Sequence, residues 1–197
     1  MIRNQTVSET QHQVEGKGKQ KAMNIEELLS KRIYMPDIKK LVSWACESEE
    51  NVFRLWHLMH SKDRTTSVNA LWTMTHLPET NAECLASLRN GMIDMLLEET
   101  DTSKKRLLLQ LLRNQAYGSD EIRTDFLDYC LSKINSECEP YAVRCFSIYA
   151  AYKMCRHFPE LIAELEEHLD MMQYQNLSPG LKSALRQTKS KISKLKK

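Results

Sequence analysis

Residues 101–116, DTSKKRLLLQLLRNQA, are the part of the sequence that decides the fold. An acidic residue opens this stretch, and a leucine-dense pattern with helical spacing follows it. The arrangement recurs 38 residues earlier, as DRTTSVNALWTMTHLP at 63–78, and 38 residues later, as EPYAVRCFSIYAAYKM at 139–154. The opening acids are therefore equally spaced, at Asp63, Asp101 and Glu139. A period of this length is typical of stacked helical hairpins.

The same helical spacing of apolar residues continues on both sides of these stretches. It predicts a short helix after Asn24, a helix from Pro36 to Ala45, and further helices over 49–61, 64–77, 82–98, 103–116, 120–136, 140–157, 160–175 and 179–195. Ser119 is the expected cap of the helix over 120–136. The helix over 140–157 is apolar nearly all round, which is typical of a central helix. Strand-like alternation is absent from the sequence, so the chain is predicted to be all-α.

Connections of two to six residues join these helices, so successive helices are expected to be antiparallel neighbours. Pairing them gives about four hairpins after a short N-terminal pair, over 49–77, 81–116, 119–157 and 159–195. We expect residues 23–197 to form a single helical domain. Residues 1–22 are polar, and we expect them to form a disordered tail, with Met23 as an alternative start of the chain.

The amino-acid composition limits the classes of protein to which this chain can belong. The 197 residues are 42% apolar and can bury one ordinary core. No run of 18 apolar residues occurs, and the first 22 residues lack the apolar segment of a secretory signal. We therefore expect a cytoplasmic protein that does not enter membranes. The six cysteines contain no C-x-x-C pair, so we expect reduced, mostly buried thiols and no zinc site.

The net charge of +2 is unevenly distributed along the chain. Residues 178–197 carry seven Lys and Arg side chains and no acid, whereas residues 23–177 have a net charge of about −7. An acidic body of this kind disfavours a dedicated nucleic-acid binder. The basic last helix either binds anions or packs against the acidic row between Glu160 and Asp170.

An arginine follows two of the three opening acids at a distance of five residues, in the pairs Asp101/Arg106 and Glu139/Arg144. Val68 takes its place in the copy that begins at Asp63. With the 38-residue period, these features resemble the HEAT/armadillo-like α-α superhelix class over residues 49–195. The resemblance implies a right-handed solenoid of about four antiparallel hairpins. It also implies that the acids and arginines form a ladder between adjacent units.

The function that the resemblance implies is that of a non-enzymatic scaffold, which binds another protein through its curved surface. The second helices would line the concave face, where the cationic candidates for binding are Arg106, Arg113 and Arg144. The alternative is that these arginines only join adjacent units. The sequence contains no Gly-rich phosphate loop, nucleophile elbow or H-E-x-x-H motif, so we expect no catalytic residues, metal or cofactor.

A nucleic-acid-binding protein is the alternative function. Bacterial DNA glycosylases that remove alkylated bases resemble this chain in architecture and size, and they use a basic concave face with an Asp beside aromatic residues. The predicted second helices of this chain carry no internal Asp. That difference counts against both DNA binding and base removal.

Two smaller groups of residues each have a functional and a structural interpretation. His57 and His60 lie three apart on one predicted helix and either contribute to a metal site or are solvated. Three tryptophans in the N-terminal third either form a stacking platform or pack in the core, namely Trp44, Trp56 and Trp72. The structural interpretation is favoured for both groups, because no acid completes a metal site and leucines flank Trp56 and Trp72.

Overall fold

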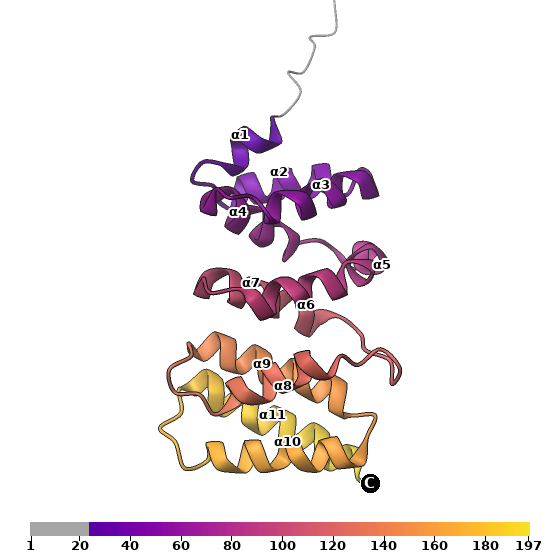
Figure 1. Cartoon of the computed structure of the whole chain (residues 1–197), viewed down its shortest axis with the longest axis vertical. Coiled ribbons are helices and arrows are strands. Elements are labelled where there is room, and N and C mark those ends of the chain that lie inside the picture. The colour runs from indigo at the N-terminus through magenta and orange to yellow at the C-terminus, as the bar shows by residue number, and fades with distance from the viewer. Residues whose placement is uncertain (1–23) are drawn as a thin grey trace, which may run out of the picture.

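The computed structural model describes residues 24–197, which form a stack of helical hairpins that follow one another in chain order (Figure 1). These residues contain no strand, so the all-α prediction is confirmed. The helices are α1 (Ile25–Leu29), α2 (Met35–Ala45), α3 (Glu49–Met59), α4 (Arg64–Met74), the 3-10 turn η1 (Glu79–Asn81), α5 (Ala82–Ser87), α6 (Arg89–Glu98), α7 (Thr102–Asn114), α8 (Thr124–Ile134), α9 (Tyr141–Cys155), α10 (Pro159–Met172) and α11 (Pro179–Leu195). The predicted tail at 1–22 lies outside the described residues.

Four hairpins form the stack, and each buries its apolar side against its neighbours. They pair α3 with α4, α6 with α7, α8 with α9, and α10 with α11, in that order from one end to the other (Figure 1). The second helices form one layer, in which α4 packs on α7, α7 on α9 and α9 on α11. In the other layer, α8 packs on both α6 and α10.

Helix α9 is the most central element, because it packs on α7, α8, α10 and α11. Its buried side chains point to several sides of the helix, as its nearly all-round apolar sequence predicts. They include Val143, Ile148, Ala150, Ala151 and Met154. The second-helix layer is therefore continuous through the middle of the molecule.

Two of the equally spaced acids cap the helices that they precede. The Asp63 carboxylate accepts a hydrogen bond from the Thr66 amide at 2.8 Å, at the start of α4. The Asp101 carboxylate accepts bonds from the Ser103 and Lys104 amides at 2.8 and 3.1 Å, at the start of α7. Such caps satisfy amides that have no partner within the helix, and their negative charge suits the helix N-terminus.

A spacing close to this period also appears in hydrogen bonds between units, whose partners lie 38 or 40 residues apart. Side chains of one hairpin donate to backbone carbonyls at the corresponding place in the previous hairpin. These carbonyls lie at or just beyond helix C-termini, where the helix itself offers no donor. The bonds join Asn69 to the carbonyls of Leu29 and Lys31, Lys153 to that of Gln115, and Gln175 to that of Asn135.

Two predicted boundaries differ most from the structure. The helix expected over 82–98 is interrupted at Leu88, which ends α5 and precedes α6. The helix expected from Asp120 begins only at Thr124, so Ser119 does not cap it. The intervening loop makes its own bonds instead, because the Gly118 amide donates to Glu121 and Arg123 pairs with Asp94 and Asp125.

Candidate functional site

A groove crosses the second-helix layer where α7, α9 and α11 lie side by side, and we call it the cationic groove. Its volume is about 620 Å³. Its lining comes from the end of α7, from α9 with the residue that follows it, and from α11. The lining residues are Arg113, Asn114, Tyr149, Tyr152, Lys153, Arg156, Gln187 and Lys191.

Aromatic rings hold two of the cations in place. The Arg113 guanidinium lies 4.3 Å from the ring centroid of Phe146 and 5.6 Å from that of Tyr149. The Lys191 ammonium lies 5.6 Å from the ring centroid of Tyr152. Contacts of this kind are worth about 0.5–1 kcal/mol at exposed sites, and more where water is excluded. They fix the direction of otherwise flexible side chains and so preorganise the groove.

The Arg113 side chain also carries an unused donor. Its Nε is buried, and no acceptor among the described residues bonds it. A buried donor without a partner costs free energy. The guanidinium also pairs with no carboxylate in residues 24–197, so its terminal N–H groups can form charge-assisted bonds with an anionic ligand.

Lys153 lies at the centre of this positive charge. Its ammonium donates to the Gln115 carbonyl at 2.8 Å, which leaves further N–H donors for a ligand. Burial lowers the pKa of Lys153, and the charges of Arg156, Lys191 and Arg113 lower it further. Each of the other three cations is therefore close enough to Lys153 to repel its charge.

Nothing in the groove neutralises these charges. The lining contains no Asp or Glu, and none of the four cations pairs with a carboxylate anywhere in residues 24–197. Elsewhere on the stack, by contrast, many basic side chains are paired, for example Lys133 with Glu139. The groove therefore suits an anionic ligand, whose negative charge would compensate the four cations.

The three predicted arginines occupy different environments. Arg113 lies in the cationic groove. Arg106 is exposed on α7 and is not part of the groove lining. Arg144 is buried and not available to a ligand: the residue is 3% exposed, and its side chain donates to the Ile134 carbonyl at 2.9 Å and to the Gln175 side chain. Arg144 thus joins the end of α8 to the loop after α10.

The predicted ladder pairs do not form within the described residues. Asp101 pairs with Arg64 of the preceding hairpin, at 2.6 Å, and Glu139 pairs with Lys133. Asp101 therefore does join adjacent units, with a different partner. An arginine one residue after the acid, as in Asp63-Arg64, reaches the next acid along the stack.

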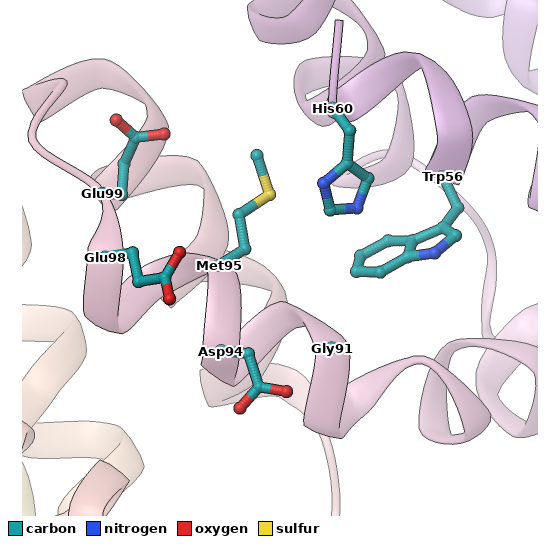
Figure 2. Close-up of a pocket in the computed structure, with 7 residues that line it drawn as sticks. All are labelled: Trp56, His60, Gly91, Asp94, Met95, Glu98 and Glu99. Atoms are coloured by element: carbon teal, nitrogen blue, oxygen red, sulfur yellow. The ribbon is translucent and has the colours of Figure 1, made fainter.

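A second hollow, of about 480 Å³, lies between α3 and α6 in the first-helix layer (Figure 2). Its lining is acidic and aromatic, and the Trp56 indole and the His60 ring meet edge to face, 4.7 Å apart. Its carboxylates are largely occupied: Asp94 pairs with Arg123, and Glu99 accepts bonds from the Thr100 and Asp101 amides. It therefore offers less uncompensated charge than the cationic groove.

The histidines and tryptophans have structural surroundings. No group of His, Cys, Asp or Glu side chains in residues 24–197 has the arrangement of a metal site. All three tryptophans are half-buried, and Trp44, Trp56 and Trp72 all pack against the core. Trp56 touches the backbone of α6 at Gly91, where a Cβ atom would lie 2.7 Å from the indole.

The six cysteines are free thiols, but only three of them are buried, fewer than predicted. Burial raises the pKa of the Cys155 thiol to about 12, which leaves it unreactive at neutral pH.

The basic last helix packs against the acidic row, because Lys189 pairs with Asp170 and Lys196 with Glu166. The structural interpretation of that helix is thus confirmed for these two lysines.

Of the residues that line the groove, Arg113 is the one that the sequence predicted by number as a binding candidate. A signal was present in α9 and just beyond it. Tyr149, Lys153 and Arg156 are spaced by four and three residues, so they share a face of an otherwise apolar helix. A polar stripe on a central helix marks the side that its neighbours leave open.

Comparison with known proteins agrees with this architecture. None of the helices in residues 24–197 has the length and apolar character needed to cross a membrane. Neither the curated proteins nor the solved structures include a match to the chain. The profile of the HEAT repeat domain family, however, matches residues 25–192, which is most of the sequence. The chain therefore belongs to the HEAT repeat domain family.

Proposed function

We propose that this protein is a non-enzymatic scaffold that binds a partner protein across its second-helix layer. The observation that carries the proposal is the cationic groove: it spans three successive second helices and holds four cations without a carboxylate among its lining residues. HEAT repeats often bind proteins, and stacked hairpins offer an extended surface for doing so.

Two observations favour a protein over a nucleic acid as the partner. Residues 23–177 carry a net charge of about −7, which repels a polyanion over most of the surface. A cation already lies over the rings of Tyr149 and Tyr152, whereas grooves for single strands offer aromatic faces on which bases stack. A mobility-shift assay with duplex DNA at low salt should show no retardation at micromolar protein.

The proposal is tested by blocking one layer at a time. The full chain is used to isolate partners from its source, and the best candidate is purified and bound to the full chain in calorimetry. Asn114 is an exposed residue of the groove, and Asn114→Trp should weaken binding at least about tenfold through bulk alone.

The matched control is Asp128→Trp, which places the same bulk on the exposed side of α8 in the first-helix layer. This variant should bind the partner like the wild type. If Asp128→Trp abolishes binding and Asn114→Trp does not, the partner uses the other layer and the proposal is wrong.

A further inference from the structure

We propose that the cationic groove binds an acidic peptide segment of the partner protein, whose carboxylate or phosphate oxygens lie among Arg113, Lys153, Arg156 and Lys191. This inference rests on the proposed function and adds the chemistry of the ligand. The four cations come from three helices, so a ligand that meets all of them must cross the layer.

The side chains of the groove suit oxyanions in geometry as well as in charge. The Arg113 guanidinium lies over the Phe146 ring and carries a planar fork of N–H donors, which matches the two oxygens of a carboxylate or phosphate. Arg156 and Lys191 are exposed at the rim, where long-range attraction guides an anion toward the groove. The amides of Asn114 and Gln187 add neutral polar contacts.

The dimensions set the length of the segment. Packed helices lie about 8–10 Å apart, so the path from α7 across α9 to α11 is about 20 Å. An extended chain covers about 3.3 Å per residue, so about six residues span the groove. A short acidic segment is therefore sufficient, and a folded partner domain is not required for this contact.

The test measures the fluorescence anisotropy of labelled peptides of about eight residues with the full chain. One peptide carries a run of glutamates, a second replaces them with glutamines, and a third replaces them with glutamines and a single phosphoserine. The glutamate peptide should bind saturably and the glutamine peptide should not. Binding of the phosphoserine peptide would identify phosphate as a sufficient source of the oxyanion.

Charge reversal locates the site. Arg156→Glu and Lys191→Glu change exposed side chains, so both variants should fold normally, and each should weaken the glutamate peptide at least about tenfold. Lys40→Glu is the matched control, because Lys40 is exposed on α2 at the opposite end of the stack (Figure 1). Raising the salt from about 0.1 M to about 1 M should also abolish binding, since the screening length falls from about 10 Å to about 3 Å.

Four outcomes would overturn the inference. Equal binding of the glutamate and glutamine peptides would show that charge is not recognised, and equal weakening by Lys40→Glu would show attraction without a site. Tight binding of a single-stranded oligonucleotide that Arg156→Glu abolishes would assign the groove to nucleic acid. If the purified partner still binds and is blocked by Asn114→Trp while both acidic peptides fail, the scaffold proposal stands and the acidic-segment inference falls.

Discussion

At the scale of single residues, the contact between Gly91 and Trp56 sets how closely α6 approaches α3. A Cβ atom at position 91 would lie 2.7 Å from Cζ2 and 3.0 Å from Cη2 of the indole, so Gly91→Ala must displace the ring. Because Trp56 is half-buried beside the hollow of Figure 2, the ring can yield, and we expect a net loss of about 1 kcal/mol. Urea denaturation and the tryptophan emission maximum should both change.

Gly180→Ala is the control for this substitution. The nearest atom to a Cβ at position 180 is the Ser178 hydroxyl oxygen, at 4.0 Å, so nothing needs to move. Alanine in α11 should therefore raise the free energy of unfolding by up to about 1 kcal/mol. If the two alanine variants have the same stability, the Gly91–Trp56 contact does not constrain the packing.

Substitutions of Arg144 and Arg106 compare a buried, structural arginine with an exposed one. Arg144→Ala removes the bonds to Ile134 and Gln175 and leaves the buried carbonyl of Ile134 without this donor. We expect the free energy of unfolding to fall by about 2–3 kcal/mol, which lowers Tm by several degrees. Arg106→Ala changes an exposed side chain and should stay within about 0.5 kcal/mol of the wild type. An unchanged melting curve for Arg144→Ala would contradict the structural role.

At the scale of helices, the apolar period predicted each long helix but not every boundary. Helices α7, α9 and α11 follow the predicted ranges closely, because their caps and apolar stripes are local signals. The break at Leu88 and the late start of α8 depend on contacts between distant residues, such as Arg123 with Asp94. Local sequence patterns do not contain this information.

The cationic groove shows the same limit. Arg113 was predicted from its place on a second helix, but its neighbours in space come from α9 and α11. The groove depends on which faces of three helices meet, and that follows from the packing of the whole stack. The partners in the ladder were mispredicted for a similar reason: Asp101 joins adjacent units as expected, but it pairs with Arg64 of the preceding hairpin and not with a predicted arginine.

Arg89 ties the break between α5 and α6 to the loop that precedes α8. Its guanidinium donates to the Ala116 carbonyl at 2.7 Å, pairs with Glu121 at 2.8 Å and lies over the ring of Tyr117. Its side chain is only 12% exposed, so Arg89→Ala should cost about 1–3 kcal/mol. Hydrogen exchange should accelerate mainly at residues 115–123.

The control for Arg89 is an exposed ion pair of similar length. Arg54 pairs with Glu26 at 2.6 Å, but both side chains are about half exposed, at 51% and 50%. Arg54→Ala should therefore cost less than about 1 kcal/mol and leave exchange at residues 115–123 unchanged. If hydrogen exchange in Arg89→Ala is faster throughout the molecule, Arg89 contributes to global stability and does not stabilise residues 115–123 locally.

At the scale of the whole molecule, the 38-residue period describes how units are joined. Polar side chains reach the ends of helices in the previous hairpin, as Lys153 does at Gln115 and Gln175 at Asn135. Each such bond satisfies a carbonyl that its own helix leaves free. The stack therefore gains both apolar contact and helix capping at these two interfaces, and stability is shared between units and interfaces.

The pair between Arg64 and Asp101 lets one such link be switched by pH. The hydrogen bond from Arg64 is the main cause that holds the pKa of Asp101 below its ordinary value. The bonds from the backbone amides that Asp101 caps lower this pKa further. Because the folded state binds this proton less tightly than the unfolded state, the link stabilises the fold above the ordinary Asp pKa of about 3.9. The stabilisation is lost as the pH falls from there through the lowered pKa.

Asp101→Asn isolates the charge, because asparagine caps a helix about as well as aspartate. Arg64 is 64% exposed, so the variant should lose at most about 1 kcal/mol at pH 7. The difference from the wild type should shrink below about pH 4 and disappear once Asp101 is protonated. Urea denaturation over this range measures it, with the exposed Glu137→Gln as a control that should show no difference at pH 7. A loss in Asp101→Asn that stays constant with pH would mean that the amide caps α7 poorly and that the ion pair between units contributes nothing.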